Sequence, residues 1–265
     1  MEQKAEEVRQ VLNPREALLK DCLCAMPSAE FIERSQEGEW LARMLFQAQR
    51  VNIKDAPQEN YEFYSWHASL RAFGRLLGQA GLRDQYVILE YCFPRPDEYT
   101  LPKRLDVMVL GKDTQGKDTA ALVELKQWQA NILRESKKSE MIWIQREGKP
   151  VEVPHPCKQP LEYDIALHEL FLQHNLDDEF LITTPYLYLH NIRKKPSASQ
   201  LTALFGSKSY ELRDYVKLYT GNFLDCFAQN LRTDVGGGKG EQVVMRLERL
   251  SILRRRVENP STSSG

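Results

Sequence analysis

Two short apolar runs with charged residues inside them place the strongest restriction on how this chain can fold. The first run, Arg104–Gly111, is interrupted by Asp106, and the second, Ala121–Trp128, is interrupted by Glu124 and Lys126. Both runs are rich in Val, Leu and Met, which predicts two β-strands. A charged side chain inside a strand costs several kcal/mol unless it is paired or holds a metal ion. Asp106, Glu124 and Lys126 therefore each need an oppositely charged partner or a metal ion in the folded protein.

The segment between the two runs predicts how they are arranged. Residues Gly111–Thr119 are polar and contain a Gln-Gly pair, which is typical of a hairpin loop between antiparallel strands. Glu124 and Lys126 are two positions apart and so point to the same face of their strand. A hairpin brings Asp106 next to them, so that two carboxylates and one ammonium group converge. Two carboxylates suit a Mg²⁺ or Mn²⁺ ion, and the alternative is a structural ion pair with Arg104 or Lys126.

An aspartate, a spacer and then Glu-X-Lys, with apolar residues before each acid, resembles the PD-(D/E)XK nuclease superfamily. The resemblance extends from about Tyr61 to Leu189, and the Val-Glu-Leu-Lys-Gln-Trp motif is similar to nuclease modules found N-terminal to bacterial helicase-like domains. The chain departs from the pattern at Leu105, where a proline often precedes the aspartate. The resemblance implies a metal-dependent nuclease that hydrolyses phosphodiester bonds, acts on DNA more than on RNA, and serves DNA processing or defence against foreign DNA.

The resemblance also implies roles for individual residues on the strands. Asp106 and Glu124 are expected to hold one or two Mg²⁺ or Mn²⁺ ions, with the Leu125 carbonyl as an extra ligand. Such a cation activates a water molecule and neutralises charge on a phosphoryl group, and Lys126 is expected to position that water. Glu90 stands in an apolar run and is either an additional metal ligand or a solvent-facing residue on an edge strand.

The helix after the Glu-X-Lys strand commonly brings a Gln or Lys to the metal and the substrate phosphate in this superfamily. Gln159 matches that position, four residues before Tyr163, and both are expected to lie near the nucleic acid. Lys158 is the alternative donor. A helix-capping or solvent-facing role is the other interpretation of Gln159.

The expected fold class is α/β, with a restriction-endonuclease-like core in which helices flank a central mixed sheet. This core requires a helix, three strands, a helix and a strand in that order. Hydrophobic patterns predict the first helix over Tyr61–Leu82, the first strand over Gln85–Phe93, the second helix over Leu161–His174 and the last strand over Asp177–Leu189. The two charged runs supply the remaining strands. Residues 129–149 are polar with alternating charge, which predicts either a helix or a mobile flap beside the site.

Two regions flank the predicted nuclease core, which spans residues 61–190. Residues 1–60 are predicted to form an N-terminal helical region with an amphipathic pattern. Residues 191–258 are predicted to form a basic C-terminal helical region. Residues 259–265 are polar and small and are predicted to be a disordered tail.

Basic residues are concentrated in the C-terminal part of the chain. The whole chain of 265 residues has a net charge of −1, whereas residues 190–256 hold 13 Lys and Arg against 6 Asp and Glu. Arg193, Lys194 and Lys195 are expected to contact nucleic-acid phosphates. A solvated surface that happens to be basic would have the same composition.

Composition limits the class of protein and its location. Hydrophobic residues make up 42% of the chain and charged residues 28%, which is typical of a globular protein rather than a disordered one. The sequence lacks a run of about 18 apolar residues, so no membrane partner is expected. Five cysteines without a framework spacing favour reduced thiols and a cytoplasmic location. The sequence is compatible with a homo-oligomer or with a helicase-like partner. The alternative function is a non-catalytic nucleic-acid- or protein-binding module with the same fold.

Overall fold

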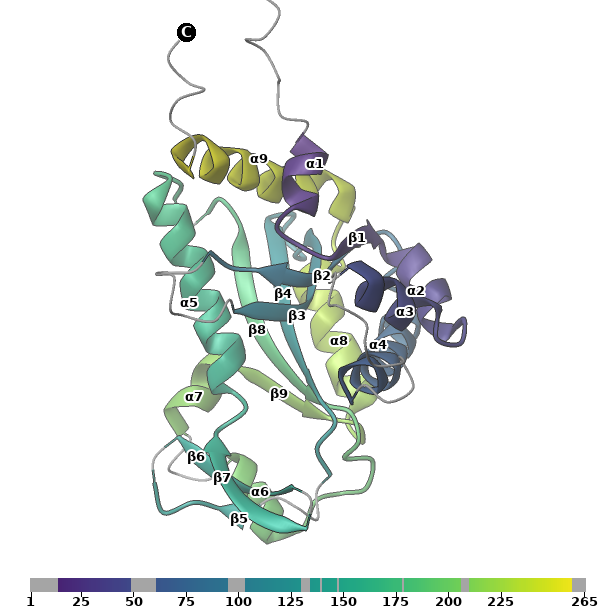
Figure 1. The fold of residues 1–265 in the computed structure, drawn as a ribbon, viewed down its shortest axis with the longest axis vertical. Coiled ribbons are helices and arrows are strands. Elements are labelled where there is room, and N and C mark those ends of the chain that lie inside the picture. The colour runs from purple at the N-terminus through teal and green to yellow at the C-terminus, as the bar shows by residue number, and fades with distance from the viewer. Residues whose placement is uncertain are drawn as a thin grey trace, which may run out of the picture.

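A six-stranded mixed β-sheet forms the centre of the protein (Figure 1). The computed structural model describes residues 14–48, 61–94, 103–129, 134–138, 140–146, 148–177, 179–205 and 210–258. The strands of the sheet lie in the order β1-β2-β3-β4-β8-β9. Their bounds are Cys24–Pro27 for β1, Tyr86–Cys92 for β2, Arg104–Lys112 for β3, Asp118–Lys126 for β4, Ile182–Leu189 for β8 and Lys217–Thr220 for β9.

The two charged strands are neighbours, as the hairpin pattern predicts. β3 and β4 run antiparallel, with Val107 opposite Val123. β4 and β8 run parallel, with Lys126 opposite Leu189. A parallel pair needs a crossover connection, and this connection contains helix α5 (Lys158–Gln173). The C-terminal ends of β4 and β8 therefore lie at the same edge of the sheet.

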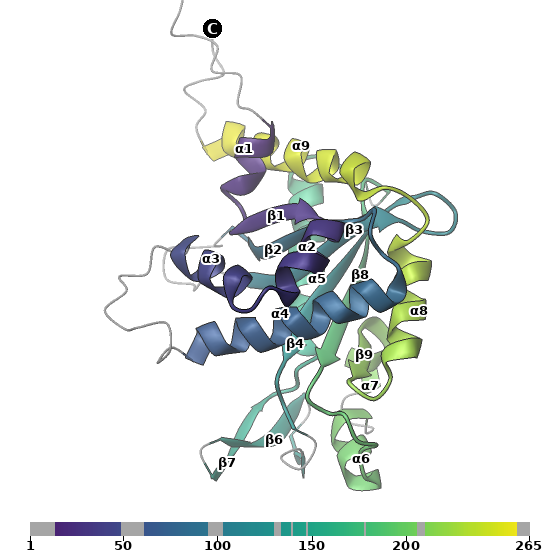
Figure 2. The same ribbon diagram turned by 90° about the vertical axis from the view of Figure 1, so that its right-hand side faces the viewer.

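Helices cover both faces of this sheet (Figure 2). One face packs against α2 (Ser28–Gln36), α3 (Trp40–Ala48), α4 (Tyr61–Ala80) and α8 (Leu224–Val235). The other face packs against α1 (Pro14–Leu19), α5 and α9 (Gly240–Glu258). Among the described residues, no helix is both long and apolar enough to cross a membrane.

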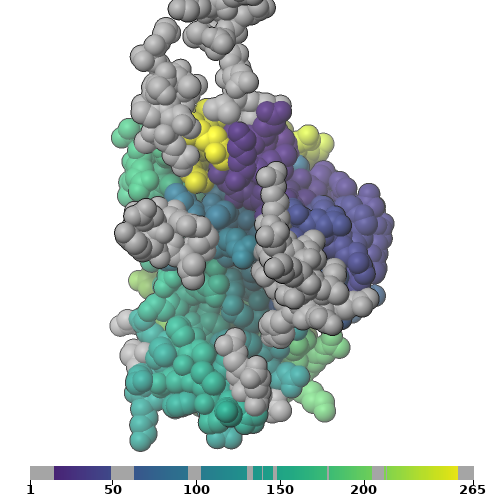
Figure 3. Space-filling view, in the orientation of Figure 1, coloured from purple at the N-terminus to yellow at the C-terminus, as the bar shows by residue number. Residues whose placement is uncertain are grey.

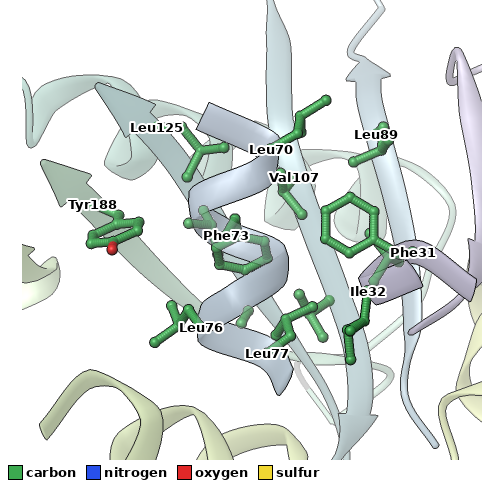
Figure 4. Packing of buried hydrophobic residues seen from close by; sticks show 14 of the residues in the cluster. Phe31, Ile32, Leu70, Phe73, Leu76, Leu77, Leu89, Val107, Leu125 and Tyr188 are labelled. Carbon is green, nitrogen blue, oxygen red and sulfur yellow. The ribbon is translucent and has the colours of Figure 1, made fainter. Parts of the chain in front are cut away.

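Helix α4 carries most of the packing on the first face (Figure 4). Its side chains Leu70, Phe73 and Leu77 recur at helical spacing and are at most 3% exposed. They belong to one hydrophobic cluster with Val107 of β3 and Leu125 of β4. Burying apolar side chains of this size contributes about 1.5–3 kcal/mol each. The cluster therefore fixes α4 against the strands that carry the charged residues.

The described part of residues 129–149 contains strands, so the prediction of a helix there is wrong. β5 (Arg134–Glu135), β6 (Met141–Arg146) and β7 (Lys149–Pro154) form a separate antiparallel sheet. Ile142 and Ile144 are two positions apart on β6 and are both buried. They pack in a cluster with residues of β8, α6 (Ala198–Phe205) and α7 (Tyr210–Tyr215). This period of two is that of a strand, and Met141 and Trp143, which alternate with the two isoleucines on β6, are only partly buried.

The α/β class and the predicted order of core elements are present, as α4, β2, β3, β4, α5 and β8. The flanking regions 1–60 and 191–258 are not wholly helical, which corrects the prediction. The N-terminal region adds β1 antiparallel to β2, and the C-terminal region adds β9 parallel to β8. Residues 1–13 and 49–60, and the predicted disordered tail at 259–265, lie outside the described residues.

Candidate active site

A cleft of about 1200 Å³ opens where β4 ends. It is lined by residues of β3 and β4, which we call its floor, of α4, and of α5, β6 and β7. Figure 1 shows how these elements are arranged. Figure 3 is a space-filling view in the orientation of Figure 1, and teal residues from the middle of the chain make up the lower part of the molecule. The four residues predicted to be catalytic all line this cleft: Asp106, Glu124, Lys126 and Gln159.

Glu124 is the most deeply buried charged residue of the cleft, with 1% of its surface exposed. Its Oε1 atom accepts a hydrogen bond from the Lys126 ammonium group. Its Oε2 atom is buried and has no hydrogen-bond partner among the described residues. Burial, followed by the negative charge of Asp106, raises the pKa of Glu124 to about 8. A buried carboxylate oxygen without a partner is costly, and a bound cation is one way to relieve that cost.

Asp106 approaches Glu124 from the neighbouring strand. The Leu125 backbone N–H donates a hydrogen bond of 2.7 Å to Oδ2 of Asp106. This contact holds the Asp106 carboxylate against the backbone between Glu124 and Lys126. The Leu125 side chain is packed in the core beneath α4. Only the backbone of Leu125 is therefore at the floor of the cleft.

A hydrogen-bonded chain runs from Lys126 to helix α5. The Lys126 ammonium donates to Oε1 of Gln159 at 2.9 Å, and the Gln159 amide donates to the Tyr163 hydroxyl at 2.6 Å. The Tyr163 ring stacks on Phe93, with 5.5 Å between ring centroids and 4° between planes. Gln159 consequently faces the site rather than solvent. Tyr163, which is 2% exposed, supports Gln159 with its hydroxyl while its ring stays in the core.

Glu90 lies on β2, which is an interior strand, so a solvent-facing position on an edge is ruled out. Its carboxylate accepts a 2.8 Å hydrogen bond from the Trp66 indole N–H and lies 3.6 Å from the Arg104 guanidinium. Its φ is 55°, a left-handed conformation that costs about 1–2 kcal/mol for a residue other than glycine. Leu89 packs beneath α4 and Tyr91 packs on the opposite face, so the strand reverses its facing at Glu90. This reversal places the carboxylate in the cleft.

The donor set fits a divalent cation held by two carboxylates. The described part of the chain contains no group of three or more His, Cys, Asp or Glu side chains arranged to hold a metal ion. Asp106 and Glu124 supply a pair of carboxylates instead. Proteins commonly hold Mg²⁺ through one or two carboxylates together with waters and substrate phosphates. The unpartnered Oε2 of Glu124 is the observation that supports this fit.

Comparisons of this chain with protein-family models, with curated proteins and with solved structures found no match. The likeness to PD-(D/E)XK nucleases therefore depends on the motif residues alone. What the protein does has to be inferred from the geometry of the cleft.

The other residues predicted to bind nucleic acid are divided between the cleft and the surface. Lys158 lines the cleft and forms an ion pair of 3.0 Å with Glu140. Arg193, Lys194 and Lys195 are exposed on the connection after β8 and do not line the cleft. They are therefore not part of the candidate site, although they lie beyond the same sheet edge.

The cleft also contains residues for which no role was predicted from the sequence. Trp66 belongs to the apolar face of α4, which predicted a core position, yet its indole N–H holds Glu90. Lys103 lines the cleft beside Glu162, and Trp128 lines it two residues after the Glu-X-Lys motif. The position of Trp128 two residues after Lys126 was the one signal in the sequence that could have identified it.

Proposed function

We propose that this protein is a metal-dependent nuclease that hydrolyses phosphodiester bonds, with DNA preferred to RNA. The observation that carries the proposal is the buried carboxylate of Glu124 beside Asp106 and Lys126 on the floor of a cleft, because one of its oxygens has no hydrogen-bond partner in the described part of the chain. Keeping such a carboxylate buried is unfavourable for stability. A functional role accounts for that unfavourable arrangement better than a structural one.

Asp106 and Glu124 are the residues that would hold the cation, with the Leu125 carbonyl next to them. A bound Mg²⁺ or Mn²⁺ would lower the pKa of a water molecule and neutralise charge on the phosphoryl oxygens. Glu90 is hydrogen-bonded to Trp66 and adds to the negative potential at Glu124. For that reason we place Glu90 around the pair Asp106 and Glu124 and not among the residues that would hold the cation.

Lys126 and Gln159 would act on the substrate directly. The Lys126 ammonium group is held in place by Gln159 Oε1, with the Tyr163 hydroxyl behind it. From this position it can donate a hydrogen bond to the attacking water or to a phosphate oxygen that gains negative charge. Preorganised donors of this kind contribute on the order of 10²–10³ in rate.

The test is a cleavage assay on circular and linear DNA, single-stranded and double-stranded, and on RNA, with Mg²⁺, Mn²⁺ or chelator. We expect cleavage that requires the metal and falls by about 10²–10³-fold in Asp106→Asn and Lys126→Ala. Glu169→Gln is the matched control, because Glu169 is exposed on the same helix as Gln159. Full activity in folded Asp106→Asn or Lys126→Ala protein would rule the proposal out.

A second candidate is favoured by the contact between Lys126 and Glu124, which is a satisfied ion pair on one of the two carboxylate oxygens. A non-catalytic nucleic-acid- or protein-binding module would use these charges structurally. The two candidates differ in metal binding, since a ligand that binds only the native state raises the melting temperature. A Mg²⁺-dependent shift that disappears in Asp106→Asn supports the nuclease, and no shift with nucleic-acid binding intact supports the module.

The cellular setting follows from the sequence resemblance. A nuclease similar to helicase-linked modules would act in DNA processing or in defence against foreign DNA. All five cysteines are thiols that form no disulfide, which is in keeping with a reducing, cytoplasmic location. A helicase-like partner or a second copy of the chain would be found by co-purification from the native host.

A further inference from the structure

One side of the cleft is apolar, although its floor is charged. Ile144 of β6 and Val153 and Pro154 of β7 line this side. Figure 2 shows where β6 and β7 lie, at the lower end of the molecule. Trp128 also lines the cleft, is half-buried, and packs against the cluster that contains Ile144. Because Trp128 is only two residues from Lys126, this apolar wall adjoins the carboxylates and the ammonium group.

The cations of the cleft are already matched by carboxylates. Every Lys or Arg side chain that lines the cleft lies against an acid, and the pairs are Lys103–Glu162 at 3.0 Å, Lys158–Glu140 at 3.0 Å, Arg104–Glu90 at 3.6 Å and Lys126–Glu124. Proteins bind duplex DNA mainly by placing Lys and Arg on many phosphates of both strands. A cleft whose cations are paired with acids is poorly suited to that mode, so affinity has to come from another part of the substrate.

We propose that the cleft takes a single nucleic-acid strand, with an unpaired base against Trp128 and the β6–β7 wall. The adjoining phosphodiester would then lie over Asp106 and Glu124. This inference rests on the proposed nuclease function and names its substrate class. In a duplex the bases stack on one another and expose only their edges, so the wall would have nothing to contact. An unpaired base offers a flat apolar face, and stacking on an aromatic side chain strengthens binding by about 5- to 150-fold per base.

The first experiment uses the unmodified protein. Fluorescence anisotropy compares a short dye-labelled DNA strand, alone and annealed to its complement, with chelator present so that nothing is cut. We expect the single strand to bind at least about 10-fold more tightly than the duplex. Because the cations of the cleft are paired with acids, few phosphates are neutralised and the dependence on salt should be weak. A series of strands, each lacking one base, should contain a position at which affinity falls by about 10-fold.

The second experiment locates the contact on the protein. Trp128→Ala should weaken binding of the single strand by about 5-fold or more, and Trp128→Phe should restore most of the loss because it keeps an aromatic face. Trp40→Ala is the control, since Trp40 is 40% exposed on α3 and does not line the cleft. Thermal melts of the three variants check that each is folded. If Trp128→Ala does not fold, the base-omission series on unmodified protein decides.

Failure of this inference and failure of the nuclease proposal give different results. Duplex binding as tight as single-strand binding, or a strand series with no sensitive base, overturns the single-strand inference. Metal-dependent cleavage of duplex DNA in the same preparation would leave the nuclease proposal standing. If no nucleic acid is bound or cut under any condition, both fall together.

Discussion

At the scale of single residues, the cleft keeps a carboxylic acid in an environment that disfavours its charge. Burial, followed by the negative charge of Asp106, raises the pKa of Glu124 to about 8. Burial and the charge of Asp106 therefore favour the neutral form of the Glu124 carboxyl group, whereas the Lys126 ammonium group favours the ionised form. A bound divalent cation favours the ionised form, so metal binding and proton release are coupled at this residue.

The substitution Glu124→Gln is expected to stabilise the metal-free protein while it abolishes cleavage. Because the folded-state pKa of Glu124 lies above its unfolded-state value, its contribution to stability is present at low pH and is lost as pH rises through about 8. Urea denaturation with chelator should show Glu124→Gln gaining on the unmodified protein between pH 5 and pH 8, by on the order of 1–3 kcal/mol. A variant that is less stable than the unmodified protein at pH 8 would contradict the burial argument.

The sequence identified the charged residues of the site but not their supports. Asp106, Glu124 and Lys126 interrupt apolar strands, and that signal can be read without a structure. Trp66 gave no such signal, because an indole on the apolar face of a helix is normally core. Its hydrogen bond to Glu90 joins residues 24 positions apart, and only the packing of α4 against the sheet creates it.

At the scale of elements, α4 packs closely against α2 at one glycine and leaves space at another. A Cβ atom on Gly74 would lie 1.9 Å from Oγ of Ser35, a residue of α2 that is itself buried. A Cβ atom on Gly78 would meet its nearest neighbour, Ile32, at 3.6 Å, which is an ordinary contact. The two glycines lie one turn apart on the same helix, so replacing either one by alanine brings the same gain in helix propensity.

Alanine at these two glycines should have opposite effects on stability. Gly78→Ala should stabilise the protein by about 0.5–1 kcal/mol, since alanine is the better helix former and space is available. Gly74→Ala should destabilise it by about 1–3 kcal/mol, because α2 has to move. Chemical denaturation of the two variants measures both values. Equal effects of the two substitutions would mean that α2 does not pack at Gly74 as described.

The small sheet β5–β7 was the part of the fold that was predicted least well from the sequence. Its strands are short, and on β6 the apolar Met141 and Trp143 alternate with Ile142 and Ile144, so the four residues form one continuous apolar run that hides the period of two. The partners that bury these side chains come from α6, α7 and β8, more than 40 residues later in the chain. Local sequence therefore could not show that one face of this segment would be covered.

At the scale of the whole molecule, the three predicted regions share their hydrophobic core. α8 and α9 contribute seven apolar side chains with no exposed surface: Phe227, Leu231, Val235, Val243, Val244, Leu247 and Leu250. Burying each of these side chains contributes about 1.5–3 kcal/mol to the free energy of unfolding. The whole free energy of unfolding of a typical domain is only about 5–15 kcal/mol. The sheet between them cannot be expected to stand without these helices.

A fragment limited to residues 61–190 is therefore expected not to fold, although it contains every residue of the motif. Loss of β1 and β9 exposes both edges of the sheet, and loss of α8 and α9 uncovers part of each face, with only α4 and α5 left to cover them. Circular dichroism and urea denaturation should show no cooperative transition for the fragment, against a clear one for the full chain. A cooperative transition in the fragment would instead support an autonomous core with two appended regions.

The sequence by itself determined the α/β class, the antiparallel pairing of the two charged strands, and the convergence of Asp106, Glu124 and Lys126. These features depend on local rules, namely a side-chain period of two and the chemistry of a short hairpin loop. The tertiary structure alone decided the reversal of β2 at Glu90, the apolar wall beside Trp128 and the common core of the three regions. Those features come from contacts between residues distant in the chain, and such contacts leave no periodic mark in the local sequence.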